Sequence, residues 1–372
     1  MRVLLVSPYP DPRWLSMERY AARLALGTEG IDFRDAHGSY FRPSPALRWA
    51  LPMYWGRPAL RSAQANGCDL VHVTDHALAH HVGLFAGWPT ITTCHDLIPL
   101  HFPMSGYSPA RRLRRVLYLR STQAMRRAAP LIAVSEATKR DMLGMLDIDP
   151  SVIDVVPVVI PHDFAPLEGA EAILASSGVV LPPGPRVLSI GHTGGSKNLE
   201  LLFAALATVE LKGAAVVRVG RKLPPALRAE LARQGLEHRV IELGNVPPQV
   251  LLALYNTCDV LAQPSWLEGF GIPVAEAQAC GLPVVCSDGG ALPEVGGDAA
   301  RIVPLEGKLG SAVDPGTASR FAAALAEVIS DATVASRMRT LGFEQVKQFR
   351  PEAVAPRLAG AYRRAVSSWH AS

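Results

Sequence analysis

The chain has 372 residues, of which 49% are hydrophobic and 19% are charged, and its formal net charge at pH 7 is +4. This much apolar material can fill packed cores, which excludes an intrinsically disordered chain. The excess of positive charge is too small for the footprint of a nucleic-acid-binding protein, so we expect no nucleic acid partner. The length suggests two domains.

The five cysteines are scattered and form no C-x-x-C pair, which argues against a disulfide framework and a structural zinc site and suits a reducing cytosol. The first apolar run covers only residues 3–6, which is too short for the core of a signal peptide. No stretch approaches 18 apolar residues in a row. We therefore expect a cytoplasmic protein without a membrane span.

Four short apolar runs in the first half of the chain are predicted strands. They cover residues 3–6, 69–73, 90–94 and 131–134. Continuous apolar strands that alternate with helices indicate a parallel sheet covered on both faces. Ser135 follows the fourth strand and is a predicted helix N-cap, because its hydroxyl can accept a hydrogen bond from the first helical turn.

A proline-rich segment separates this half from the next. Seven prolines lie between residues 150 and 185, interrupted by a helix-like run of small residues near 169–177. Clustered prolines are typical of a boundary between domains.

The second half repeats the alternation of strands and helices. Strands are predicted at 186–190, 215–219, 240–243, 259–262 and 283–287, and helices at 199–206, 224–234, 248–257, 273–280 and 351–369. The chain is therefore expected to be α/β, with two doubly wound halves. In such sheets ligands bind at the carboxyl ends of the strands, so we expect the chemistry in the loops that follow them.

The loop after the predicted strand at 259–262 carries the densest signal. Gly269 and Gly271 allow the backbone to bend and to approach a ligand, and Pro273 suits the first turn of a helix that ends near Gly281. Free N–H groups at 269–273 would form an anion site.

Two acidic residues lie eight positions apart in the same segment. Glu268 precedes the predicted helix and Glu276 lies about one turn inside it, so the two carboxylates can meet different parts of one extended ligand. The alternative is an ordinary charge at the helix N-terminus together with a solvated helix residue.

Residues 264–276 resemble the signature of the retaining family 4 glycosyltransferases, in which two glutamates are separated by seven residues. The resemblance continues through 277–285 and 292–295, and pieces at 95–99, 133–136 and 197–198 follow the family's order. It implies the GT-B architecture, with two Rossmann-like domains that face each other across a cleft.

The implied domain bounds follow from this architecture. An N-terminal acceptor-side domain would cover 1–165, and a C-terminal donor domain, which binds the nucleotide sugar, would cover 166–345. A final helix within 346–372 would cross back onto the first domain.

The resemblance also implies the roles of particular residues. Glu268 would contact the transferred sugar near the reacting carbon, Lys197 would neutralise the leaving diphosphate, and His95 would touch the donor sugar, so that these three form the catalytic set. Glu276 would accept hydrogen bonds from the ribose hydroxyls. The remaining implied donor-binding positions are Gly194, Gly195, Asn198, Gly269, Phe270, Gly271 and Ile272.

Two features depart from the family pattern. The family pairs its phosphate-binding lysine with an arginine in the same loop, but residues 191–197 contain no arginine, so His192 or Arg221 would have to substitute. The glycine-rich turn usual after the first strand is also missing, because residues 13–20 contain no glycine. This loop shapes the acceptor side, so the acceptor cannot be inferred from the resemblance.

No metal or other cofactor is expected. His76, His80 and His81 follow a predicted strand, but their spacing is a weak signal for metal. For His95, the alternative to a contact with the donor sugar is a satisfied loop histidine. In the retaining reaction the leaving phosphate itself would deprotonate the acceptor, so the chemistry needs no second carboxylate as nucleophile.

Residues 109–127 contain seven arginines and no acidic residue. This segment is either an ordinary surface helix or a contact for anionic lipid or a lipid-linked diphosphate acceptor at the inner face of the membrane.

The resulting prediction is a retaining glycosyltransferase of polysaccharide biosynthesis. It would transfer a hexose, with mannose from GDP-mannose as the leading candidate, to a glycan, lipid-linked or small-molecule acceptor. The alternatives are a sugar-nucleotide epimerase of GT-B fold and a catalytically impaired subunit or sensor that binds a nucleotide sugar.

Overall fold

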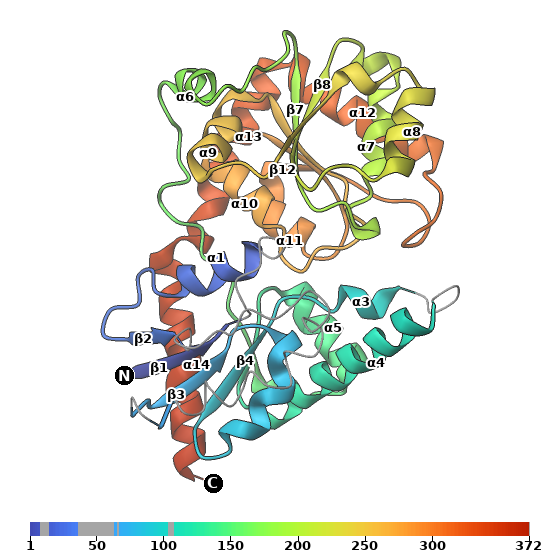
Figure 1. Ribbon diagram of the computed structural model, residues 1–372. Helices are drawn as coiled ribbons and strands as arrows, with labels where there is room; N and C mark the ends of the chain where they lie inside the picture. The colour runs from blue at the N-terminus through green and yellow to red at the C-terminus, as the bar shows by residue number, and fades with distance from the viewer. Residues whose placement is uncertain (8–14, 36–62, 65–66, 103–107, 372) are drawn as a thin grey trace. The chain divides into compact units, whose positions relative to one another are not determined.

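The computed structural model describes residues 1–7, 15–35, 63–64, 67–102 and 108–371. The described chain divides into two compact units, one formed by Met1–Pro161 with Phe349–Ser372 and the other by His162–Gln348. Each unit is built on one six-stranded parallel sheet with helices around it, which confirms the predicted fold class (Figure 1).

The first unit has the strand order β2-β1-β3-β4-β5-β6. Its strands are β1 (Arg2–Val6), β2 (Asp32–Asp35), β3 (Leu70–Val73), β4 (Thr90–Cys94), β5 (Leu131–Ala133) and β6 (Ile153–Val155). Its α-helices are α1 (Leu15–Leu24), α3 (Ile98–His101), α4 (Pro109–Ala124), α5 (Glu136–Leu146) and α14 (Pro351–Ala371). The central strands β3, β4 and β5 are buried along their whole length, as predicted for a sheet covered on both faces, although β3 contains His72 and β4 contains three threonines.

Two of these helices are held by contacts of particular side chains. Ser135 caps α5, since its hydroxyl accepts a hydrogen bond from the N–H of Thr138 at 3.0 Å, which confirms the predicted N-cap. The final helix α14 packs against β3 and β4 of the first unit. Tyr362 on α14 and His72 on β3 join them through a buried hydrogen bond of 2.7 Å between the phenol and Nδ1 of the ring.

The second unit has the strand order β12-β11-β10-β7-β8-β9. Its strands are β7 (Arg186–Gly191), β8 (Ala215–Gly220), β9 (Val240–Gly244), β10 (Val260–Gln263), β11 (Val284–Ser287) and β12 (Ala300–Val303). Its α-helices are α6 (Ala170–Ser176), α7 (Leu199–Leu206), α8 (Pro225–Arg233), α9 (Pro248–Thr257), α10 (Ile272–Ala279), α11 (Leu292–Gly296), α12 (Pro315–Ser330) and α13 (Ala332–Val346). Helices α7, α8 and α12 cover one face of the sheet, and α9, α10 and α13 cover the other (Figure 1).

Three strands were not anticipated from the sequence: β2, β6 and β12. All three lie at the edge of a sheet. An edge strand has a neighbour on one side only and tolerates polar residues, so it lacks the continuous apolar run that identifies a buried strand. Of the segment at 13–20 that departs from the family pattern, residues 13–14 lie outside the described residues and residues 15–20 belong to α1.

None of the helices in the described part of the chain has the length and hydropathy that crossing a bilayer requires.

Candidate active site

The predicted donor-binding residues of the second unit gather where the strand order reverses. The chain runs from β7 outward to β8 on one side of the sheet and from β10 outward to β11 on the other, while β7 and β10 pair with each other. The loops that follow β7 and β10 therefore diverge from a shared starting point. This topological switch point is where doubly wound sheets bind their ligands.

Lys197 and Glu268 form a direct ion pair at this point. Lys197 Nζ lies 2.6 Å from Glu268 Oε1, and their side chains are 14% and 9% exposed. Gln263 Nε2 and Ser265 Oγ donate to the same carboxylate oxygen at 2.6 and 2.7 Å. Burial alone would raise the pKa of Glu268, but the charge of Lys197 and the three hydrogen bonds outweigh it and hold the pKa below its usual value. Glu268 is therefore an anion at neutral pH.

The two loops are also joined through their backbones. Trp266 N–H donates to the carbonyl of Ser196 at 2.7 Å, and the Asn198 amide donates to the carbonyl of Pro264 at 3.1 Å. Asn198 has a left-handed backbone with φ of 49° at the start of α7, and its side chain is buried. The structure thus gives Asn198 a role in holding the loops together.

A third loop, after β11, holds the backbone of Glu268. The N–H of Ala291 donates to the carbonyl of Glu268 at 3.0 Å. A Cβ atom at Gly289 would lie 2.3 Å from the carbonyl of Ser265, and one at Gly290 would lie 2.3 Å from that of Glu268. Neither glycine was predicted from the sequence, although a Gly-Gly pair one residue after a predicted strand is the signal that could have found them.

Glu276 is buried in α10 rather than solvated, so the alternative of an exposed helix residue is wrong. It is 3% exposed, and Tyr255 of α9 donates its phenol hydrogen to Glu276 Oε2 at 2.8 Å. The helix begins as predicted, because Gly271 adopts a φ of 92° before Ile272, and Pro273 lies in the first turn. Gly281 follows the helix with a φ of 74°, as its predicted role as the stop requires.

The remaining positions of this segment surround the helix N-terminus. Phe270 is buried, whereas Gly269 and Ile272 are partly exposed. A Cβ atom at Gly271 would lie 2.9 Å from Leu292 Cδ2, so a side chain there would both strain the backbone and displace its neighbour.

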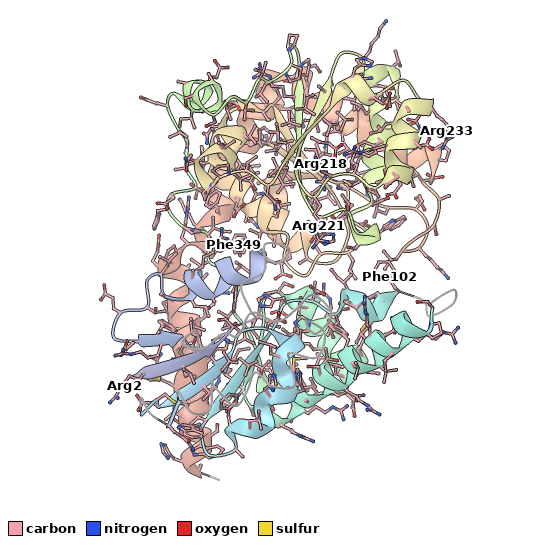
Figure 2. The ribbon with its side chains drawn as sticks, viewed as in Figure 1. Arg2, Phe102, Arg218, Arg221, Arg233 and Phe349 are labelled. Atoms are coloured by element: carbon pink, nitrogen blue, oxygen red, sulfur yellow. The ribbon has the colours of Figure 1, made fainter. Side chains whose placement is uncertain are left out.

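The loop after β7 contains His192 and the two glycines at 194 and 195. The N–H of Gly194 donates to His192 Nδ1 at 2.9 Å, and a Cβ atom at Gly194 would clash with the same ring. Removal of the ring from water, with the nearby charge of Lys197, lowers the pKa of His192 to about 4. The ring is therefore neutral at pH 7, and because Nδ1 accepts, its hydrogen is on Nε2. Arg221 lies just beyond β8 (Figure 2).

The third predicted catalytic residue, His95, belongs to the first unit and follows β4. Its Nε2 donates to the carbonyl of Thr74 at 2.7 Å, and its ring packs edge-on against Tyr20 with a centroid distance of 4.5 Å. Its backbone N–H donates to His76 Nδ1 at 3.3 Å. Burial lowers the pKa of His95, and the charge of Asp75 only partly opposes it, so the ring is neutral near pH 7.

The described residues contain no group of three or more His, Cys, Asp or Glu side chains arranged to hold a metal ion. His76 Nε2 is hydrogen-bonded to Tyr118, and His80 Nδ1 to Ser121. Asp147 and Asp149, which are two residues apart, have local structural roles. Asp147 ends α5, and the Asp149 side chain accepts a hydrogen bond from the N–H of Ser151.

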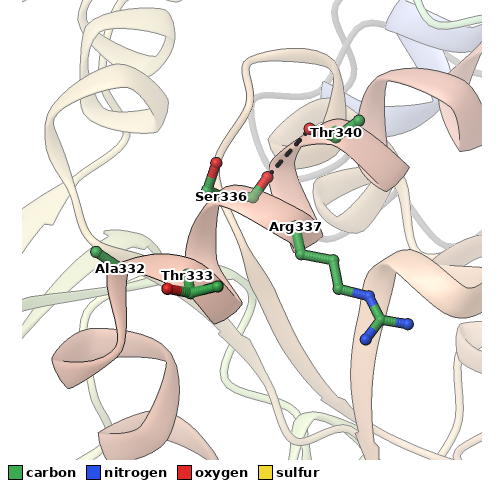
Figure 3. A pocket seen from close by; sticks show the side chains of 5 residues that line it. All are labelled: Ala332, Thr333, Ser336, Arg337 and Thr340. Atoms are coloured by element: carbon green, nitrogen blue, oxygen red, sulfur yellow. Dashed lines mark hydrogen bonds between the residues drawn. The ribbon is translucent and has the colours of Figure 1, made fainter.

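A pocket of about 470 Å³ lies elsewhere in the second unit, along α13 (Figure 3). Its lining residues are Ala332, Thr333, Ser336, Arg337 and Thr340. All of them come from one helix, and none belongs to the loops after β7 or β10, so this pocket is not part of the candidate active site.

Comparison with known proteins agrees with this geometry. The family described as "Glycosyltransferase Family 4" matches residues 4–164, and the family described as "Glycosyl transferases group 1" matches residues 180–345. The O-antigen chain mannosyltransferase B of Escherichia coli is 26% identical over 280 residues, which span 73% of this chain and 70% of the relative.

Two solved structures share the fold over nearly the whole chain. Sucrose-phosphate synthase of Thermosynechococcus elongatus has a TM-score of 0.77 at 20% identity and covers 99% of both chains. HepE of Anabaena, solved in complex with UDP and glucose, has a TM-score of 0.73 at 18% identity and covers 98% of this chain and 100% of its own.

Proposed function

Because the chain belongs to glycosyltransferase family 4 and has the GT-B fold, we propose that it transfers a hexose from a nucleotide sugar to a glycan, lipid-linked or small-molecule acceptor with retention of configuration. Lys197, Glu268 and His95 form the catalytic set. No metal or other cofactor takes part.

The contact between Lys197 and Glu268 carries this proposal. In a nucleotide sugar, the reacting carbon is bonded directly to an oxygen of the terminal phosphate. A carboxylate that stabilises positive charge at that carbon and a cation that stabilises the departing phosphate must therefore be neighbours. Their charged atoms lie 2.6 Å apart at the switch point of the sheet, where a ligand of this kind binds.

The other residues divide the donor between them. Glu276, about one turn inside α10 and hydrogen-bonded to Tyr255 of α9, accepts hydrogen bonds from the ribose hydroxyls. The backbone at 269–272 and the loop of Gly194 and Gly195 contact the diphosphate and the sugar. The neutral ring of His192 donates from Nε2 to a phosphate oxygen, and Arg221 adds charge nearby. Asn198 joins the loops after β7 and β10 through its hydrogen bond to the carbonyl of Pro264.

GDP-mannose is the leading donor. The supporting observation is the E. coli mannosyltransferase relative, whose match covers 73% of this chain. HepE was solved with UDP and glucose, so a UDP-sugar is the alternative.

A thermal-shift screen with GDP, UDP, ADP and their sugar conjugates tests the donor. A ligand that binds only the folded state raises the melting temperature, with a stabilisation of about 2.7 kcal/mol at a concentration of 100 times the Kd. We expect a shift with one nucleotide series and transfer from its sugar conjugate to an added acceptor. Donor isomerisation without an acceptor would favour an epimerase. Binding of the nucleotide sugar with neither transfer to an acceptor nor slow hydrolysis would favour a non-catalytic subunit.

We further propose that α4 contacts an anionic membrane surface at the inner face of the cell membrane. Leu113, Val116 and Leu117 form an apolar stripe on this helix and are 57%, 41% and 46% exposed. Exposed arginines at 112 and 114 flank the stripe. An apolar stripe beside basic residues binds anionic lipid. Arg115 has a structural role instead, because its guanidinium donates to the carbonyls of Leu100 and Phe102.

Co-sedimentation with liposomes tests this contact. Leu113→Glu combined with Leu117→Glu should release the protein from anionic vesicles, while Val209→Glu should not, although Val209 is 77% exposed in the second unit. Equal binding of all three proteins, or no binding of the wild type, would refute the membrane contact.

A further inference from the structure

A buried arginine lies directly beneath the loop after β7. Arg218 belongs to β8 and is 1% exposed, and it is among the largest fully buried side chains of the described residues (Figure 2). It was not a candidate in the sequence analysis, because an arginine inside a predicted strand carries no motif.

The guanidinium of Arg218 is hydrogen-bonded to backbone carbonyls, and the nearby acid Glu242 on β9 acts on it through its charge without forming an ion pair. One terminal nitrogen donates to the carbonyls of Gly191 and His192 at 2.6 and 3.1 Å, and the other lies 3.4 Å from those of Ser189 and Val219. Within the described part of the chain no carboxylate forms an ion pair with it, and its Nε has no acceptor. Burial lowers the pKa of Arg218 to about 10, although the charge of Glu242 partly opposes the shift, so the side chain remains charged at neutral pH.

Stability alone does not account for this arrangement. A cation that is removed from water without a directly bonded carboxylate destabilises the fold, and the unsatisfied Nε of Arg218 adds to that penalty. Residues that break a rule of packing in this way are concentrated at functional sites.

The position of Arg218 determines how the loop presents its backbone. In a planar trans peptide, the carbonyl and the N–H point in opposite directions. Because the carbonyls of Gly191 and His192 point to the guanidinium, the N–H groups of the same two peptides, those of His192 and Thr193, point away from it. Successive N–H groups that point the same way form a concave site for anions.

Gly191 is the centre of this arrangement. Its carbonyl lies against Gly220 of β8, where a Cβ atom would lie 2.1 Å away, and a Cβ atom at Gly191 would lie 3.4 Å from Lys197 Cε. One peptide is thus held between the stem of Lys197 and the guanidinium of Arg218. Both cations act on the segment in which the family's usual arginine is missing.

We propose that Arg218 is a positioning residue for the diphosphate of the donor. Its guanidinium aligns the backbone N–H groups after β7 toward the phosphates and supplies the positive charge that the loop lacks. This inference rests on the proposed function, since it assumes a nucleoside diphosphate ligand.

Three variants test it: Arg218→Gln, Arg218→Lys and the control Arg239→Gln. Arg239 also donates to three carbonyls, those of Leu206, Leu211 and Ala214, but it does so at the amino end of β8, away from the loop. The probes are whichever of GDP, UDP and ADP stabilises the wild type, together with the corresponding nucleoside monophosphate. Their Kd values are measured by calorimetry.

We expect Arg218→Gln to weaken the diphosphate about tenfold and the monophosphate less than threefold, as loss of a charge-assisted contact requires. Arg218→Lys, which keeps the charge without the planar fork, should lie between, and it provides the measurement if Arg218→Gln does not fold. Arg239→Gln should leave both affinities unchanged, even where it lowers the melting temperature.

A second readout is the titration of His192 by NMR. Lys197, Glu268, Arg221 and Arg218 all act on this ring, and loss of the Arg218 charge should raise the pKa of His192 while Arg239→Gln leaves it unchanged. An unchanged ratio of diphosphate to monophosphate affinity with an unchanged His192 titration would overturn the role of Arg218. A wild type that binds no nucleoside diphosphate would instead refute the proposed function on which this role depends.

Discussion

Removing the partners of the Lys197–Glu268 pair one at a time tests whether the site is an electrostatic unit. The variants are Lys197→Met, Glu268→Gln and the double variant, all of which keep the side-chain volume nearly constant. Among the residues that the structure describes, Lys197→Met leaves the neutral donors Gln263 and Ser265 to a carboxylate that is 9% exposed.

The expected magnitude follows from the geometry of the pair. At the observed separation of 2.6 Å, two unit charges attract by roughly 6 kcal/mol at an effective dielectric constant of about 20. Dehydration of the two ions cancels much of this gain, whereas breaking the pair leaves an uncompensated buried charge. We expect losses of unfolding free energy of about 3 kcal/mol for Lys197→Met and about 2 kcal/mol for both Glu268→Gln and the double variant, hence a coupling of about 3 kcal/mol.

The pH dependence provides a separate check. In the wild type the pKa of Glu268 is lowered, so the pair stabilises the fold above the unfolded pKa of about 4.3, and this contribution is lost as the pH falls through the lower folded pKa. In Lys197→Met, burial dominates and raises the pKa, so the fold loses stability as the pH rises above about 4.3. The difference between the two proteins should therefore be small near pH 4 and grow toward pH 7.

Urea unfolding followed by far-UV circular dichroism at several pH values measures both effects. Lys347→Gln with Glu344→Gln is the control, because these two side chains are also 2.6 Å apart but 67% and 64% exposed, and their coupling should be below about 1 kcal/mol. Equal couplings for the buried and the exposed pair, or a difference that does not vary with pH, would refute this reasoning. In activity assays, Glu268→Gln should slow turnover by on the order of 100-fold or more while nucleotide affinity changes little.

Three further changes test neighbouring contacts. Glu276→Ala should weaken nucleotide binding at least tenfold by calorimetry, and Tyr255→Phe, which removes the 2.8 Å hydrogen bond to that carboxylate, should weaken it about threefold. Wild-type affinity in both variants would exclude Glu276 from the ribose site. Gly220→Ala should cost about 3 kcal/mol of unfolding free energy, since its Cβ would lie 2.1 Å from a carbonyl oxygen at a φ of 120°, and wild-type stability would contradict the close approach. Tyr362→Phe should cost about 1–3 kcal/mol because it leaves the buried His72 Nδ1 without its partner, and an unchanged melting temperature would exclude that hydrogen bond as an anchor of α14.

Local signals in the sequence were enough for the central strands and for α10. Strands buried on both faces are mainly apolar or β-branched, so β3, β4 and β5 were recognisable, although β3 contains the buried His72 and β4 contains three threonines. Gly271, Pro273 and Gly281 act through their own backbone preferences, and the helix they delimit was predicted to within a residue at each end.

Edge strands and support residues could not be predicted in this way. The polar strand β2 and the three-residue strand β6 exist because a neighbouring strand offers them hydrogen-bonding partners, which is a long-range effect. Arg218 lies inside an apolar strand, where no motif points to it, and only the fold shows that its guanidinium meets the carbonyls of Gly191 and His192 in the loop after β7.

The sequence by itself nominated the candidate residues without any coordinates: spacing pointed to Glu268 and Glu276, and the family resemblance added Lys197. The tertiary structure decided how they work together. Lys197 and Glu268 are 71 residues apart along the chain, and their charged atoms meet because parallel pairing of β7 with β10 brings two strand ends to one edge of the sheet. Glu268 stays ionised although it is buried, because Lys197, Gln263 and Ser265 reach it from different segments of the chain, an arrangement that no local stretch of sequence encodes.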